Sequence, residues 1–156
     1  MLQIILIAWI LLCAAIDARF QRVPNLLVGI GLIGALLVLL LSSQTLTGAS
    51  WNQAMMALLA GLLLGVPGYR RGQMGAGDVK LLAVLGLASD LMHLLFSVVG
   101  AGLALVVWGL AAARLWRYLP AATRTSLAHF APENIQRLPY IPFLLVGFLG
   151  ATALLV

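Results

Sequence analysis

Long apolar runs separated by short polar connections make up most of the chain. Six runs can be marked, at about residues 2–20, 25–42, 52–67, 76–89, 91–113 and 139–156. The stretch 79–113 is too long for one membrane span, because about 20 residues cross the hydrocarbon core. The polar pair Ser89 and Asp90 inside it therefore predicts a tight turn between two helices. The pattern predicts an all-α polytopic membrane protein with six transmembrane helices, built as a single transmembrane domain over residues 1–156.

The composition supports this class. Hydrophobic residues make up 63% of the chain and charged residues only 8%, whereas a soluble domain carries roughly 25% charged residues. In a soluble protein, the net charge of +5 would suggest a nucleic-acid partner, but here the basic residues occupy short connections between apolar runs. We therefore expect a lipid bilayer around the protein and no nucleic-acid partner.

The single cysteine, Cys13, lies inside the first apolar run. One thiol excludes an intrachain disulfide and a cysteine-based zinc site, so we expect no metal and no cofactor, and Cys13 itself is expected to be packed or lipid-facing. The first run also lacks the basic segment of a secretory signal, and another apolar run follows it. It is therefore interpreted as the first transmembrane helix.

The basic residues alternate between connections. They are Arg19 and Arg22 in the first, Arg70 and Arg71 in the third, and Arg114, Arg117, Arg124 and Arg137 in the fifth. Apart from Lys80, none lies elsewhere. The positive-inside rule places these three connections in the cytoplasm, with residues 114–138 as the long cytoplasmic loop. Both termini are then non-cytoplasmic, as an even number of spans requires.

Two of the four acidic residues are drawn into the membrane edge. Leu2 to Ile16 gives only about 22 Å of helix against a core of about 30 Å, so the first span must continue past Asp17. The run that starts at Val79 is shorter still, and its span must take in Asp78. Both carboxylates thus lie at the cytoplasmic ends of their helices, and ionisable groups at this depth are candidates for function.

Two carboxylates held close together cannot both ionise easily, so such a pair shares one proton. The ionised carboxylate can take a proton from water while the protonated one polarises a peptide carbonyl. This chemistry is that of an aspartic endopeptidase, with Asp17 and Asp78 as the candidate catalytic pair.

Structural roles also fit these two residues. Asp17 could form an ion pair with Arg19 or Arg22. Asp78 could pair with Lys80 or with Arg70 and Arg71, or it could cap the N-terminus of its helix, where a carboxylate is favourable.

The other two acidic residues, Asp90 and Glu133, are expected to be solvated. Asp90 marks the turn on the opposite face of the membrane, and Glu133 lies in the polar loop.

Gly72, Gly75 and Gly77 precede Asp78. Glycine permits positive φ angles and the close approach of another backbone. Non-helical backbone at membrane depth is tolerated only where it is buried in protein or lines a wet cavity. The segment therefore suits a peptide substrate lying against the protein, although an ordinary glycine-rich turn has the same composition.

Three segments resemble those of the type IV prepilin peptidases, which are intramembrane aspartic proteases. GAGDVKLL at 75–82 resembles the family's G-x-G-D signature, and DARFQRVPN at 17–25 resembles its first-aspartate segment. RLPYIPFLLVG at 137–147 is similar to the beginning of the family's last helix. The resemblance covers essentially the whole chain, and it matches Asp17 and Asp78 to the catalytic pair.

The resemblance also matches Gly75 and Gly77 to the motif glycines, and it places Lys80 where the family often has a lysine that can position substrate or tune the pair. It implies that the protein cleaves the short basic leader from prepilin or pseudopilin precursors, for type IV pilus assembly or protein secretion. Cleavage would occur at the cytoplasmic face of the bacterial inner membrane.

Larger members of this family also carry paired CxxC motifs and N-methylate the new N-terminus. With one cysteine and no such insertion, the chain is expected to have no methyltransferase activity. It resembles the compact peptidases of tight-adherence (Flp-type) pilus systems.

Two other functions fit a small membrane protein with buried carboxylates. One is a non-enzymatic assembly subunit of a pilus or secretion machine, in which the carboxylates bond helices together. The other is a proton-coupled transporter, since paired carboxylates also relay protons. Against transport, both carboxylates lie near one face of the membrane.

Overall fold

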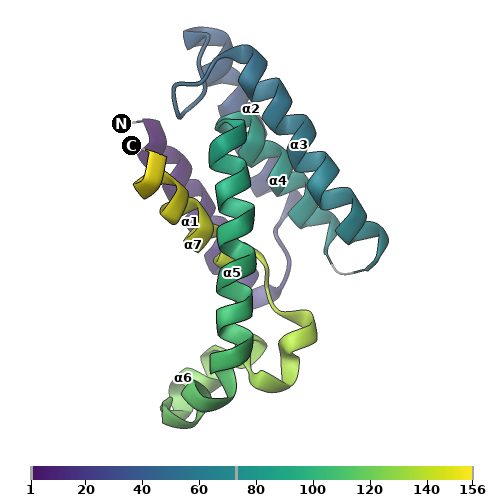
Figure 1. The fold of residues 1–156 in the computed structure, drawn as a ribbon, viewed down its shortest axis with the longest axis vertical. Coiled ribbons are helices and arrows are strands. Elements are labelled where there is room, and N and C mark those ends of the chain that lie inside the picture. The colour runs from purple at the N-terminus through teal and green to yellow at the C-terminus, as the bar shows by residue number, and fades with distance from the viewer. Residues whose placement is uncertain (1, 73, 156) are drawn as a thin grey trace.

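Helices dominate the computed structural model, which describes residues 2–72 and 74–155 (Figure 1). Its α-helices are α1 (Leu2–Phe20), α2 (Asn25–Ser42), α3 (Trp51–Arg70), α4 (Ala76–Ala88), α5 (Leu91–Leu115), α6 (Ala121–Ser126) and α7 (Ile141–Leu155). Short 3₁₀ turns lie at Trp116–Tyr118, Ala128–Phe130 and Pro132–Arg137. The described residues hold no strand beyond an isolated bridge between Gln44 and Ser50. The prediction of an all-α protein is confirmed.

Within the part of the chain that the structure describes, four helices are long and apolar enough to cross a membrane, namely α1, α2, α3 and α5 with the turn that follows it. α4 and α7 are apolar but shorter, with 13 and 15 residues. α4 lies in the core, and all its residues from Leu81 to Ala88 are buried. A helix that is apolar on every side is typical of such a buried position. α3 extends to Arg70, beyond the apolar run that ends near residue 67, because the run marks only the apolar part of the helix.

Glycines allow close contact between two pairs of helices. α4 packs against α3 and α2, whereas α1 and α5 both pack against α7. A Cβ atom at Gly86 of α4 would collide with the carbonyl group of Ala57 in α3, and one at Gly147 of α7 would collide with the backbone of α5 at Ser97. Small residues at such contacts are typical of helix packing in membranes.

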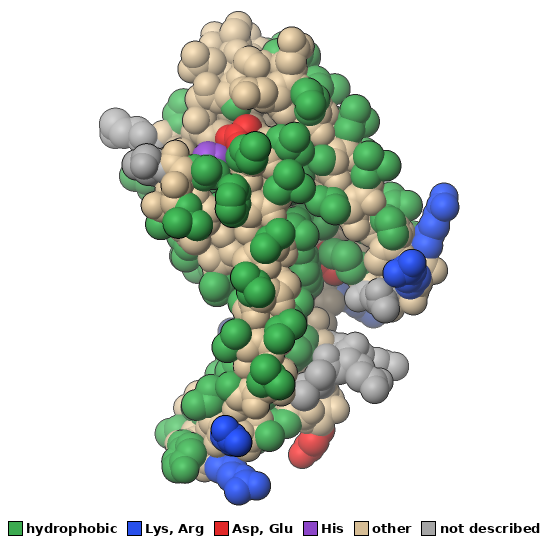
Figure 2. Space-filling view, in the orientation of Figure 1, with side chains coloured by type: hydrophobic (Ala, Val, Ile, Leu, Met, Phe, Trp, Pro, Cys, Tyr) green, Lys and Arg blue, Asp and Glu red, His purple; other side chains and the backbone are tan. Residues whose placement is uncertain are grey.

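The two ends of the chain lie side by side, next to each other at α1 and α7 (Figure 1). In Figure 2, Lys and Arg side chains are visible at the end of α3, at about mid-height on the right, and at the bottom, around the segment that follows α5. In that segment, α6 directly follows Pro120 and a 3₁₀ turn begins at Pro132, since proline suits the start of a helix. The side chain of Arg137 and residue Val156 lie outside the described residues.

Candidate active site

Asp17 lies in the last turn of α1 and is buried, with 4% of its surface exposed. Its Oδ2 accepts a hydrogen bond of 3.1 Å from the backbone N–H of Ile141, the first residue of α7. The first N–H groups of a helix have no partner inside the helix, and the N-terminus of a helix favours a negative charge. The start of α7 therefore holds the Asp17 carboxylate in place.

Asp78 is the third residue of α4 and is half-buried. Its Oδ2 accepts a hydrogen bond of 3.0 Å from the backbone N–H of Gly75, the residue that caps α4. Asp78 therefore caps the N-terminus of its helix, which is one of the structural roles considered from the sequence. Capping uses only one oxygen of the carboxylate, so it leaves the other oxygen for chemistry.

The fold places one carboxylate in the last turn of α1 and the other in the first turn of α4. Asp17 and Asp78 are close enough for their charges to interact. Among residues 2–72 and 74–155, no hydrogen bond joins the two carboxylates directly. Tyr140, next to Ile141, is in turn close enough to Asp78 for an electrostatic interaction. The beginning of α7 therefore lies near both carboxylates.

The ion pairs that the sequence left open for Asp17 and Asp78 do not form with Arg19, Arg22 or Lys80 in the described part of the chain. Arg19 and Arg22 are exposed, and the part of the chain that the structure describes shows no ion pair between them and Asp17. Lys80 Nζ donates a hydrogen bond of 3.1 Å to Oδ1 of Asn25, at the start of α2. Lys80 thus ties α4 to α2 beside the site, without neutralising Asp78.

Gly75 and Gly77 provide space rather than an unusual backbone. Neither has a positive φ; in this segment Gly72 does, with φ of 69°. A Cβ atom at Gly75 would lie 3.3 Å from Oδ2 of Asp78, which is tight, so glycine keeps room for the carboxylate. A Cβ atom at Gly77 would meet nothing closer than 3.7 Å, so the chain itself does not require glycine there.

Sequence reasoning gave no role to Tyr140, Ile141 or His129. His129, in the segment after α5, also lies within electrostatic range of Asp17. The sequence pointed to this region only through the similarity of residues 137–147 to a family segment. That similarity did not show that a backbone N–H of the segment bonds the Asp17 carboxylate in α1.

Replacing Ile141 with proline is expected to lower the free energy of unfolding by about 2 kcal/mol relative to Ile141→Val, because it deletes the N–H that bonds a buried carboxylate. Proline is tolerated as the first residue of a helix, so α7 should still form. Thermal unfolding in detergent measures the difference. Valine keeps the N–H and is similar in size to proline, so equal stability of the two variants would show that the hydrogen bond contributes nothing.

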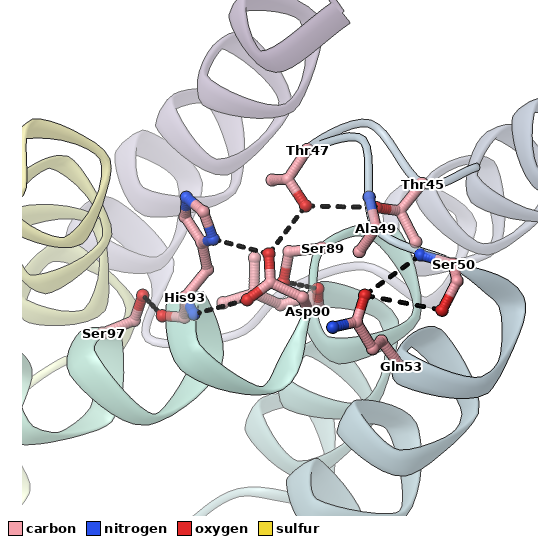
Figure 3. A network of polar contacts seen from close by, with 10 residues as sticks. Thr45, Thr47, Ala49, Ser50, Gln53, Ser89, Asp90, His93 and Ser97 are labelled. Atoms are coloured by element: carbon pink, nitrogen blue, oxygen red, sulfur yellow. Dashed lines mark hydrogen bonds and ion pairs between the residues drawn. The ribbon is translucent and has the colours of Figure 1, made fainter. Parts of the chain in front are cut away.

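A second polar cluster surrounds Asp90, at the turn between α4 and α5 (Figure 3). Oδ1 of Asp90 accepts from the backbone N–H of His93, at 3.0 Å, and caps α5. Its Oδ2 accepts from Nδ1 of His93 at 2.6 Å and from Oγ1 of Thr47 at 2.9 Å. The expectation of a solvated Asp90 is wrong, since its side chain is only 15% exposed. The loop between α2 and α3 folds over this turn, and the Thr47 hydroxyl group bonds Asp90 in place of water.

Glu133 is exposed, as expected.

The pKa of Asp90 gives a pH dependence of stability. Burial alone would raise this pKa, but the hydrogen bonds from His93 and Thr47 outweigh burial and lower the pKa to about 2. Because the folded-state pKa is depressed, the stabilisation is complete above about pH 4 and is lost as the pH falls toward 2.

Unfolding measured between pH 5 and pH 2 is therefore expected to show a loss of about 2 kcal/mol that is absent from Asp90→Asn. The Asp90→Asn variant should already lack this stabilisation at pH 5. A variant that loses stability with pH as the wild type does would exclude Asp90 as the cause.

Comparison with known proteins adds one result. A sequence model described as the type IV leader peptidase family matches residues 4–110. No curated protein and no solved structure gives a significant match to the chain. The matched segment contains both Asp17 and Asp78, whereas Ile141 and the rest of α7 lie outside it.

Proposed function

The chain belongs to the type IV leader peptidase family, whose model matches more than half of its residues, and from this premise we propose that it is an intramembrane aspartic endopeptidase. Its substrates would be prepilin or pseudopilin precursors, from which it removes the short basic leader at the cytoplasmic face of the membrane. One observation carries the proposal: two buried or half-buried carboxylates, from helices α1 and α4, lie within electrostatic range of each other.

The chemistry needs only the two carboxylates and water. One carboxylate takes a proton from water as the water oxygen bonds to the scissile carbonyl carbon. The other, protonated, donates a hydrogen bond to the carbonyl oxygen. The resulting tetrahedral intermediate breaks its C–N bond as a proton passes to the leaving amine, and the pair again holds one proton.

The hydrogen bonds from Ile141 and Gly75 support this role. Each fixes one oxygen of a carboxylate, so the other oxygen can face water or the peptide. Fixed catalytic groups lower the cost of reaching the reactive geometry. Gly77 adds no side chain beside Asp78, which suits the passage of a substrate backbone, and Lys80 would hold the start of α4 against α2 through its hydrogen bond to Asn25.

The topology we propose has six spans in the bacterial inner membrane, within a single transmembrane domain, and both termini non-cytoplasmic. The helices α4 and α7 are too short to cross the membrane alone. The non-helical segments that precede them would cross the remaining depth, and these segments would lie at the same depth as the two carboxylates. Two features support an even number of spans: the two ends of the chain lie side by side, and basic residues gather at the other end (Figures 1 and 2).

The test is cleavage of a precursor that has a short basic leader and an apolar helix. Membranes containing the protein should release the leader, and mass spectrometry should show a mature chain with an unmethylated N-terminal amine. Membranes without the protein are the control. An intact precursor beside a folded protein would favour the non-enzymatic assembly subunit, and a methylated product would contradict the peptidase-only activity.

A further inference from the structure

The helices α1 and α2 follow each other in the chain but leave surface depressions between them, and we call this boundary between the two helices the seam. α1 packs mainly against α7, and α2 packs mainly against α4. Between them lies an apolar groove of about 220 Å³. Its lining residues include Ile5 and Trp9 of α1 and Ile30, Gly31, Gly34 and Val38 of α2.

The seam continues toward the cytoplasmic end of α1. A second depression, of about 500 Å³, is lined by Ile16 and Phe20 of α1 and by the residues that lead into α2. Ile5, Trp9, Ile16 and Phe20 are spaced by 4, 7 and 4 residues, so they lie on one face of the helix. Both depressions therefore lie along the same stripe of α1, and the lower one is lined by Ile16, which precedes Asp17 in the chain.

The α2 wall of the groove has room for another helix. Gly34 has no atom within 4 Å of where a Cβ would lie, whereas Gly31 is covered by the ring of Trp9. The indole N–H of Trp9 donates a hydrogen bond of 3.0 Å to the carbonyl oxygen of Leu27, so its only polar atom is satisfied inside the seam. An apolar wall with open space at the Cβ position of a glycine allows the close approach that helix packing in membranes requires.

We propose that the seam between α1 and α2 is the docking site for the apolar helix of the precursor. This inference rests on the proposed function. Ile5 lies 12 residues before Asp17, or about 18 Å along the helix, so a substrate helix in the seam would run about half the membrane depth before its leader junction meets the carboxylates. The lower depression lies beside the candidate pair, because its lining includes Val23, which contacts Gly77, and Asn25, which accepts a hydrogen bond from Lys80. This position beside the segment that carries Asp78 favours the precursor helix over a lipid chain, which has no reason to lie next to the catalytic pair.

A matched pair of glycine variants tests the site. Gly34→Leu places a side chain in the groove, whereas Gly29→Leu lies on α2 outside it; neither Cβ has an atom within 4 Å, so both proteins should fold. Gly34→Leu is expected to raise KM for precursor cleavage by about tenfold or more with little change in kcat, because it blocks binding and not chemistry. Gly29→Leu should leave KM unchanged. Equal KM values for the two variants would overturn the proposal.

Crosslinking locates the bound helix independently of catalysis. In an Asp78→Asn, Cys13→Ala background, Ile5→Cys should form a disulfide with a cysteine placed in the apolar helix of the precursor. Leu103→Cys, on α5, is the control, since its exposure of 63% matches the 60% of Ile5. A crosslink at Leu103 but not at Ile5, or at neither, would overturn the seam as the docking site. A crosslink at Ile5 with a precursor that the wild-type protein does not cleave would keep the seam as a docking site and reject the proposed activity.

Discussion

Asp78→Asn and Asp17→Asn are each expected to lower the rate of leader removal by about 1,000-fold or more, because general acid–base catalysis typically supplies this much. An amide can neither take a proton from water nor hold the proton that the pair shares. The rate is measured from the release of the leader in membranes with equal amounts of folded protein.

Asparagine is nearly the same shape as aspartate, and its side-chain oxygen can still accept from Gly75 or Ile141. The fold should therefore survive in both variants. Glu133→Gln is the matched control, since it removes an exposed carboxylate from the same chain and should cleave at the wild-type rate. The double variant should be no slower than either single variant, because residues that act as a unit are not additive. A folded single variant that retains the wild-type rate would remove that residue from the chemistry.

Gly147→Leu is expected to destabilise the protein by about 3 kcal/mol, through overpacking between α5 and α7. The added side chain would meet the backbone of α5 at Ser97 and Ala101, and a backbone cannot move aside as a flexible side chain can. Since the start of α7 also bonds Asp17, cleavage should fall together with stability. Thermal unfolding in detergent and the cleavage rate are measured on the same preparation.

Gly150→Leu is the control on the same helix. It lies three residues further along α7 and has no atom within 4 Å of its Cβ position. It should keep both the wild-type midpoint of unfolding and the wild-type rate of cleavage. If the two leucine variants were equally stable, the close contact between α5 and α7 would not be what holds α7 in place.

The helices could be predicted from the sequence because apolar runs in a membrane protein mark the segments that must satisfy their own backbone hydrogen bonds. α1 and α2 begin and end where their apolar runs do. α3 runs past its apolar segment to Arg70, because a polar end can continue a helix outside the hydrocarbon core. The short helices between α5 and α7 were missed because the loop there has no apolar run to mark them.

The two candidate catalytic residues could be found because a carboxylate in an apolar run is costly and therefore conspicuous. The partners of those carboxylates could not be found in this way. The hydrogen bond from Ile141 to Asp17 comes from a backbone N–H, which every residue except proline has, and it joins residues 124 positions apart. Asp90 was taken as solvated because a turn residue usually is, and only the fold shows that Thr47 covers it.

The position of the scissile bond tests most directly whether Asp17 and Asp78 form one active site. A structure of the Asp78→Asn variant with a bound precursor would supply it. The expected result is a scissile carbonyl carbon within about 4 Å of both side chains, directly or through one water. A leader junction bound elsewhere, with the side chains at positions 17 and 78 in contact only with the protein, would contradict the proposed mechanism.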